Sequence, residues 1–205
     1  MRLAILLSGR GSNFGAIQDA IARRELDAEI VCVISNRPDA PGIERARALN
    51  LPAQVIDHRA FDSRAAHEAE VLRVLGEARP DFIALAGYMR LLSPAFIAAY
   101  PMRIVNIHPS LLPAFPGVDA QAQAIAYGVK ISGCTVHFVD ENLDAGPIIV
   151  QRAVPVREDD NVSSLAARIL EEEHGAYVEA LRKLAAGKYR VEGRRVVFDS
   201  YSSDL

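Results

Sequence analysis

The chain has 205 residues, half of them hydrophobic and 6% aromatic, which is enough to bury the core of one large domain. Its formal net charge of −3 argues against nucleic acid or an anionic membrane as a partner, although a small anionic ligand needs only a few local donors. No stretch approaches the roughly 18 uninterrupted apolar residues of a membrane span, and the short apolar start does not fit a signal peptide, so we expect a cytoplasmic protein.

The first half alternates short apolar runs, typical of buried strands, with stretches of helical period. Strands are expected at Leu3–Leu7, Ile30–Ile34, Ala53–Ile56, Asp81–Ala86 and Arg103–Ile107. Helices are expected at Phe14–Arg24, Gly42–Leu49, Ser63–Glu77 and Pro94–Tyr100. This alternation predicts a parallel sheet with helices on both faces, a Rossmann-like arrangement.

The pattern changes after Pro116. A short helix is expected at Ala120–Tyr127, two strands joined by a loop at Cys134–Val139 and Ile148–Val156, a long amphipathic helix at Ser163–Ala186, a hairpin at Tyr189–Phe198 and a disordered tail at Asp199–Leu205. No linker or repeat interrupts the chain. We therefore predict one domain over residues 1–205, an α/β three-layer fold whose mostly parallel mixed sheet ends in an antiparallel part.

The first strand runs into a helix through the loop Ser8-Gly9-Arg10-Gly11-Ser12-Asn13. Glycines let the backbone approach a ligand, and the helix start presents free N–H groups to an anion. A dinucleotide fingerprint needs a third glycine where Phe14 stands, and the Gly-Lys-Ser/Thr of a Walker loop is missing. The loop therefore predicts a phosphate monoester site, the alternative being a glycine-rich turn without a ligand.

A second polar cluster follows the strand at Arg103–Ile107. Asn106 and His108 are two residues apart on an extended segment, so we expect their side chains to share one face. An amide beside an imidazole is a plausible oxyanion stabiliser and proton-transfer group. Pro109 and Pro113 restrict the following loop.

The segment Val139–Pro147 holds three acids before a strand. It is either a solvated acidic turn or the source of a carboxylate beside His108, which would raise the pKa of that histidine by favouring the imidazolium. The remaining histidines are scattered and fit no metal motif, so we expect no metal site. A serine triad is also not supported, because no GxSxG elbow is present.

Four segments stand out together: residues 9–13, Ala86-Gly87-Tyr88-Met89-Arg90-Leu91-Leu92, Asn106-Ile107-His108-Pro109-Ser110-Leu111-Leu112-Pro113, and residues 140–147. Taken together they resemble the phosphoribosylglycinamide formyltransferases, folate-dependent enzymes of purine biosynthesis. The resemblance runs from Leu3 to about Tyr177. It implies an enzyme that uses 10-formyltetrahydrofolate as co-substrate and 5′-phosphoribosylglycinamide as acceptor, with residues 1–100 as the phosphate-binding half and 101–205 as the folate and catalytic half.

The resemblance also implies which residues are catalytic, which bind the ribonucleotide and which bind the folate. The catalytic residues would be Asn106, His108 and Asp144. The ribonucleotide would be bound by Gly11, Ser12, Asn13, Leu170 and Glu173, although leucine at 170 offers no hydrogen bond. The folate would contact Arg64, Met89, Arg90, Leu91, Leu92, Asn106 and the loop Asp140, Glu141, Asn142, Leu143 and Asp144. Residues 119–121 stand where the family often has histidines, so we assign them no role.

The implied chemistry is attack of the substrate amine on the formyl carbon, with Asn106 and protonated His108 stabilising the oxyanion and Asp144 orienting His108.

Within the family, a methionyl-tRNA formyltransferase would need a further domain and a basic surface, and a deformylase usually adds an N-terminal regulatory domain. A sugar-amine formyltransferase would not need the phosphate loop. Outside this chemistry, a non-catalytic folate- or nucleotide-binding module remains an alternative. We expect small molecules as the binding partners, and either a monomer or a homodimer as the oligomeric state.

Overall fold

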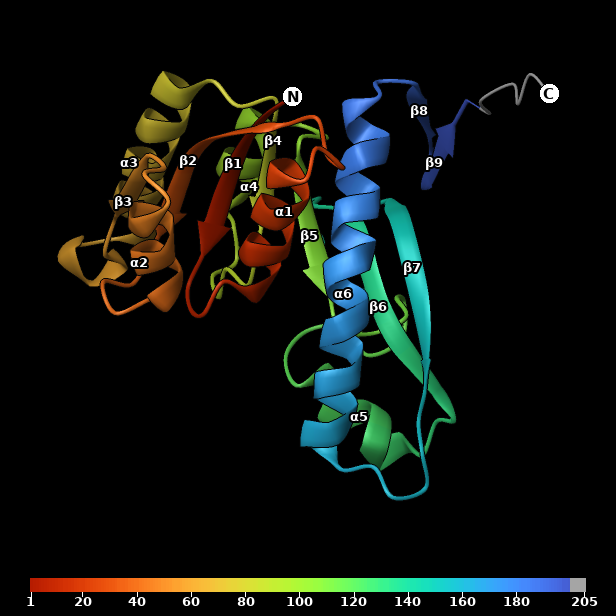
Figure 1. The fold of residues 1–205 in the computed structure, drawn as a ribbon. Coiled ribbons are helices and arrows are strands. Elements are labelled where there is room, and N and C mark those ends of the chain that lie inside the picture. The colour runs from red at the N-terminus through yellow and green to blue at the C-terminus, as the bar shows by residue number, and fades with distance from the viewer. Residues whose placement is uncertain (200–205) are drawn as a thin grey trace.

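A computed structural model describes residues 1–199 of the chain. One sheet of nine strands in the order β3-β2-β1-β4-β5-β6-β7-β9-β8 crosses the molecule (Figure 1). The strands are β1 (Arg2–Leu7), β2 (Glu29–Ser35), β3 (Ala53–Val55), β4 (Phe82–Leu85), β5 (Ile104–His108), β6 (Ile131–Phe138), β7 (Ile148–Pro155), β8 (Tyr189–Glu192) and β9 (Arg195–Phe198). The helices are α1 (Ser12–Ala22), α2 (Pro41–Ala48), α3 (Arg64–Ala78), α4 (Pro94–Ala99), α5 (Ala120–Tyr127) and α6 (Val162–Ala185), with the short 3₁₀ helix η1 at His58–Ala60.

Two hydrophobic cores lie on opposite faces of this sheet, because alternate residues of a strand point to opposite sides. In β1, Leu3, Ile5 and Leu7 pack into the core beneath α1, α2 and α6. Ala4 and Leu6 pack into the other core, beneath α3 and α4. The predicted α/β fold with helices on both faces is confirmed.

The sheet changes direction at β5. Strands β3, β2, β1, β4 and β5 are parallel, whereas β5–β6 and β6–β7 pair in antiparallel fashion, as the sequence predicted for the second half. Helix α6 covers β6 and β7 and also packs against α1. Its start is capped by Asn161, whose side chain accepts a hydrogen bond from the Ser164 N–H at 3.0 Å.

Three expected boundaries were displaced. Helix α1 begins at Ser12 because Gly11, with φ +68, turns the chain directly into the helix; a Cβ there would meet Gly42 and Leu7 at 3.3 Å. Strand β6 begins at Ile131, three residues earlier than expected, because residues 131–133 already pair with residues 153–155 of β7. Asp199 was expected in a disordered tail, but its N–H donates to the Lys188 carbonyl at 3.0 Å. Residues 200–205 lie outside the described part of the chain.

Tyr177 of α6 joins the helix to the centre of the sheet. Its side chain is fully buried, and its hydroxyl lies 2.9 Å from the Val105 carbonyl and 3.2 Å from the Leu85 carbonyl, to which it donates. We expect Tyr177→Phe to lower the free energy of unfolding by about 1–2 kcal/mol, because a buried hydrogen bond is lost without a change in packing. Urea unfolding measures this, and Tyr127→Phe, at an exposed position, should be neutral. Equal stability of the two variants would contradict the role of the hydroxyl.

Both cysteines, Cys32 and Cys134, are buried and free. Burial raises the pKa of the Cys32 thiol to about 11 and that of Cys134 to about 12, so both remain protonated at neutral pH. Within residues 1–199, no helix is long and apolar enough to cross a bilayer.

Candidate active site

A row of polar side chains lies on the face of β5 and β6 that points away from α6. The antiparallel register places Asn106 opposite His137, and His108 opposite Thr135. Their neighbours Val105, Ile107, Val136 and Phe138 point the other way, into the core beneath α6. The prediction that Asn106 and His108 share one face is therefore confirmed, and the pairing adds two polar residues from β6.

Asp144 completes this cluster from the loop between β6 and β7. One of its carboxylate oxygens lies 3.4 Å from His108 Nδ1, and the other lies 3.8 Å from His137 Nε2. The Gly117 N–H donates to the same carboxylate at 2.8 Å. Asp144 itself has φ +47, an uncommon conformation for a residue other than glycine. One acid of the loop thus approaches His108, as the sequence analysis anticipated.

His137 orients Asn106. Its Nδ1 lies 2.8 Å from the Phe138 carbonyl, which only accepts, so Nδ1 carries a hydrogen. Burial lowers the pKa of His137, so the ring is neutral at neutral pH and its Nε2 accepts. Asn106 Nδ2, at 3.3 Å, then donates to that nitrogen. The second hydrogen of the Asn106 amide remains available to a ligand, and Asn106 is only half-buried.

Both ring nitrogens of His108 face oxygen acceptors. Nε2 donates to the Phe115 carbonyl at 2.8 Å, while Nδ1 faces the Asp144 carboxylate. The side chain is buried, with 4% of the residue exposed. A substrate oxygen that approaches Nε2 would therefore have to replace the Phe115 carbonyl.

The segment that follows β4 leaves the sheet beside this cluster, because Leu85 pairs with Asn106. The start of this segment is fixed by a hydrogen bond that the Met89 N–H donates to the buried hydroxyl of Ser8 at 2.8 Å. Ser8 in turn donates to Asn36 Oδ1 at 2.5 Å. This anchor leaves the Met89 side chain 78% exposed and the Leu91 side chain 66% exposed.

The end of the same segment is held by a buried carboxylate on α3. Glu68 accepts from the N–H of Ser93 at 3.0 Å and from its hydroxyl. Arg64, predicted to contact the folate, donates its Nε to the same carboxylate at 3.0 Å. Glu68 thus links Arg64 to the segment that carries Met89, Arg90, Leu91 and Leu92, and it was not identified from the sequence.

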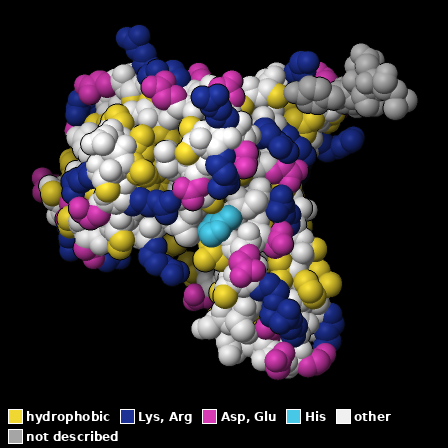
Figure 2. Space-filling model, viewed as in Figure 1, with side chains coloured by type: hydrophobic (Ala, Val, Ile, Leu, Met, Phe, Trp, Pro, Cys, Tyr) yellow, Lys and Arg dark blue, Asp and Glu magenta, His cyan; other side chains and the backbone are white. Residues whose placement is uncertain are grey.

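The loop between β6 and β7 is largely buried at Asp144 and exposed in its middle. Glu141, Asn142 and Leu143 are exposed, and Asp140 accepts from the Asn142 N–H at 2.9 Å. Figure 2 shows that the surface is recessed between the body that carries α1 and α2 and the lobe that carries α5. Strands β1 and β5 end toward this recess (Figure 1). Exposed apolar side chains beside such a recess suit a planar aromatic ligand.

The predicted phosphate loop meets α6. Asn13 Nδ2 donates to Glu173 Oε2 at 2.9 Å, and both side chains are buried. Gly11 closes the loop, and Ser12 opens α1 half-buried. Leu170 lies one turn before Glu173 on the same helix and is half-buried. The structure therefore brings together Asn13 and Glu173, which are 160 residues apart in sequence.

Burial raises the pKa of the Glu173 carboxyl above its ordinary 4.5, although the hydrogen bond from Asn13 opposes this. The folded state then binds the proton more tightly than the unfolded state. Its contribution to stability is present below about pH 4.5 and is lost as the pH rises through the raised pKa. We expect Glu173→Gln to be more stable than the wild type near neutral pH, with the difference shrinking in acid.

Urea unfolding at several pH values tests this expectation. Glu171→Gln changes the same charge at an exposed position of α6 and serves as the matched control. A Glu173→Gln variant that is less stable than the wild type near neutral pH would show that the charged carboxylate contributes to folding. A buried carboxylate that weakens the fold is typical of a ligand-binding site.

Besides Glu68, two residues of β6 were missed at the level of sequence. His137 was counted among the scattered histidines, yet it lies between Asn106 and Asp144. Thr135 donates to the Ser110 carbonyl at 2.7 Å and accepts from the Leu112 N–H at 3.0 Å, which fixes the loop after His108. The alternation of β6 was the available signal, because it places residues 135 and 137 on the face opposite Val136. Within residues 1–199, no three His, Cys, Asp or Glu side chains are grouped as metal ligands.

Comparisons with known proteins agree on one family. The sequence model described as formyl transferase matches residues 1–181. Phosphoribosylglycinamide formyltransferase of Escherichia coli (strain K12) is 38% identical over 211 residues, covering all of both chains. The crystal structure of glycinamide ribonucleotide transformylase 1 from Symbiobacterium toebii superposes with a TM-score of 0.94 at 49% identity, covering 97% of this chain and 93% of that one.

A longer relative matches as well. The trifunctional purine biosynthetic protein adenosine-3 of Drosophila melanogaster is 50% identical over 188 residues, which are 91% of this chain. This chain spans only 14% of that protein's length. The family match and the full-length similarity lead to one conclusion: the chain belongs to the formyl transferase family, in its phosphoribosylglycinamide formyltransferase branch.

Proposed function

We propose that the protein transfers the formyl group of 10-formyltetrahydrofolate to the primary amine of 5′-phosphoribosylglycinamide, a step of purine biosynthesis. The observation that carries the proposal is the cluster of Asn106, His108 and Asp144 on the face of β5 and β6 that points away from α6. A buried imidazole beside a carboxylate and an oriented amide is suited to acyl transfer through an oxyanion. The folate supplies the formyl carbon, and no metal is required.

In this proposal Asn106, His108 and Asp144 each have a separate role in the transfer. The amide of Asn106, oriented by His137, has one N–H left to donate to the developing oxyanion. His108 provides the second donor when a substrate oxygen replaces the Phe115 carbonyl at Nε2. Asp144 holds the ring from the other side through Nδ1. Proton transfer between the attacking and leaving nitrogens would pass through water.

The binding roles rest on the surrounding segments. Met89 and Leu91 offer exposed apolar surface to the folate ring, Arg90 and Leu92 continue that wall, and Arg64 is attached to its end through Glu68. The loop from Asp140 to Asp144 would close on the other side of the ring. Gly11, Ser12 and Asn13 would hold the phosphate, and Glu173 would meet the ribose end. In this assignment residues 1–100 carry the phosphate site, and residues 101–205 carry the catalytic cluster.

An absorbance assay of folate release tests the proposal when it is run with and without the amine. Release that depends on 5′-phosphoribosylglycinamide is the expected result. Equal release without the amine would identify a hydrolase of formyl folate instead. No release in either case, with the folate still bound, would favour a non-catalytic binding protein.

A further inference from the structure

A buried carboxylate on α3 lies where the segment after β4 ends. The Glu68 side chain is 9% exposed, and it accepts from the Ser93 N–H at 3.0 Å and from the Ser93 hydroxyl. The oxygen atom that accepts from the Ser93 N–H also accepts from Arg64 Nε at 3.0 Å. Arg64 and Glu68 are four residues apart, so they share one face of α3. One carboxylate thus joins a cation of α3 to the segment after β4.

The position of this carboxylate is fixed through α4. Ser93 is the N-cap of α4, and its hydroxyl accepts from the Phe96 N–H at 3.2 Å. Phe96 is itself buried in the core between α3, α4 and the sheet. Ser93 also follows directly after residues 89–92, which we call the apolar wall because Met89 and Leu91 expose apolar side chains there. Glu68 is therefore held in place at the end of the apolar wall.

The contact with Glu68 fixes one part of the Arg64 guanidinium and leaves the rest open. Arg64 donates through Nε, and within residues 1–199 neither of its Nη atoms donates a hydrogen bond. The side chain is 44% exposed, so these Nη atoms can reach a ligand. A guanidinium held at Nε presents its remaining N–H groups in a fixed plane, which is the geometry that binds a carboxylate.

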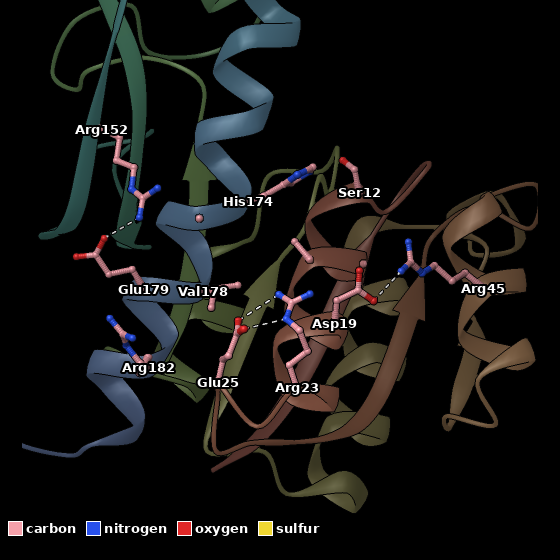
Figure 3. Close-up of a pocket in the computed structure, with 13 residues that line it drawn as sticks. Ser12, Asp19, Arg23, Glu25, Arg45, Arg152, His174, Val178, Glu179 and Arg182 are labelled. Atoms are coloured by element: carbon pink, nitrogen blue, oxygen red, sulfur yellow. Dashed lines mark hydrogen bonds and ion pairs between the residues drawn. The ribbon is translucent and has the colours of Figure 1, made fainter.

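Arginines elsewhere in the chain are held less firmly. In the groove between α1 and α6, Arg23 pairs with Glu25 at 2.9 Å and Arg45 pairs with Asp19 at 3.3 Å (Figure 3). Both carboxylates are more than half exposed, so each pair joins two flexible side chains in contact with solvent. Arg64 differs because its partner is buried and hydrogen-bonded to the start of another helix.

A second cation lies at this end of the apolar wall. Burial lowers the pKa of His67 on α3, and the charge of Arg90 acts in the same direction, so Arg90 lies near α3. Within residues 1–199, Arg90 has no ion pair. Two guanidinium groups beside the single carboxylate of Glu68 leave a net positive charge, which favours an anion. A ligand that combines a flat apolar ring with a carboxylate tail would fit the apolar wall and these two cations.

We propose that Glu68 is a positioning residue for the co-substrate: it holds Arg64 so that the Nη groups meet the carboxylates at the glutamate end of 10-formyltetrahydrofolate. The inference rests on the proposed function for the identity of the co-substrate. The ring then lies on the exposed side chains of Met89 and Leu91, and the charged tail extends toward α3. Because Glu68 orders Arg64 before the ligand arrives, less conformational entropy is lost on binding.

Glu68→Gln tests this role, because glutamine can keep the bonds to Ser93 while the charge that holds Arg64 is lost. We expect the KM for 10-formyltetrahydrofolate to rise by about 5- to 20-fold, the usual effect of weakening a hydrogen bond to a charged group. The KM for 5′-phosphoribosylglycinamide should stay within twofold of wild type, and kcat within about threefold. With a neutral analogue of the co-substrate, in which an alkylamide replaces the glutamate, the variant should match the wild type.

Glu70→Gln is the matched control. It makes the same change on the same helix, where the Glu70 carboxylate pairs with Arg73 at 2.7 Å, and it should leave both KM values unchanged. An equal rise in KM for formyl folate and for the neutral analogue would mean that Glu68 only supports the apolar wall, and would overturn the proposal. A KM for formyl folate within twofold of wild type in Glu68→Gln would overturn it as well.

A double-mutant cycle shows whether Glu68 acts through Arg64. Arg64→Leu should raise the KM for formyl folate at least as much as Glu68→Gln does. Adding Glu68→Gln to Arg64→Leu should then change the KM by less than about twofold, because the group that Glu68 positions is already gone. Fully multiplicative effects of the two substitutions would show that Glu68 acts independently of Arg64.

A readout on the wild-type protein decides if Glu68→Gln does not fold. Titration with 10-formyltetrahydrofolate, without an acceptor, should shift the ¹⁵N resonances of the Arg64 Nη atoms, which are assigned by their absence from Arg64→Leu. The neutral analogue should not shift them, and unchanged Nη resonances while formyl folate binds would overturn the proposal. Folate binding that depends on Glu68 in a protein without formyl transfer would contradict the proposed function alone. Formyl transfer that is indifferent to position 68 would contradict only the role of Glu68.

Discussion

His108→Ala should lower kcat by about 10²–10³-fold, the usual cost of removing one oxyanion donor. The imidazole is buried between the Phe115 carbonyl and the Asp144 carboxylate, so alanine removes a donor that solvent does not readily replace. The Phe115 carbonyl also loses its partner, which should cost about 1–2 kcal/mol of unfolding free energy. That loss is smaller than the total stability of a typical domain, so the fold should survive.

Steady-state kinetics and urea unfolding on the same preparation separate the two effects. The loss should appear in kcat, because the donor acts most strongly as charge develops on the formyl oxygen. A folded variant with kcat within tenfold of the wild type would show that His108 is not a catalytic residue. In that case Asn106 alone would carry the oxyanion.

Asp144→Asn should have an effect of similar size, with kcat lower by about 10²-fold or more. The change preserves the shape of the side chain but removes the charge that faces His108 Nδ1 at 3.4 Å and His137 Nε2 at 3.8 Å. An amide can also rotate and present its N–H₂ to His108, which would push the ring out of position. Asp144 therefore acts by positioning His108.

The split between kcat and KM distinguishes this positioning role from a structural one. Asp144→Asn should lower kcat far more than it changes the KM for either substrate, because the altered contact is with His108. Asp159→Asn, at an exposed position outside the site, is the matched control and should leave both unchanged. A loss of kcat that is accompanied by partial unfolding in urea would mean that Asp144 only shapes the loop through the Gly117 N–H.

The order of the elements was predictable from the sequence because each strand of the parallel half is a continuous apolar run between helical stretches. β1 is typical, with Leu3–Leu7 fully buried on both faces. Boundaries were less predictable where a glycine plays an unexpected role. Gly133 lies inside β6, where a side chain would overlap the Arg152 carbonyl on β7, and nothing local in the sequence reveals that close approach.

The candidate site was predictable where its residues are close in sequence. Asn106 and His108 share a strand face by simple alternation, and the phosphate loop is one continuous segment. His137 was missed because its role depends on the register of β5 against β6, which places it opposite Asn106. Glu68 was missed because its contact with Ser93 joins α3 to the start of α4. Such contacts between elements become visible only when the chain is folded.

The central claim is that the formyl group passes to an amine of a phosphorylated glycinamide. The most direct test uses 10-formyltetrahydrofolate labelled with carbon-13 in the formyl group, mixed with the protein and 5′-phosphoribosylglycinamide and followed by NMR. The account predicts that the label moves into the formamide of the acceptor. Label that appears as free formate, or stays on the folate while both ligands are bound, would contradict it.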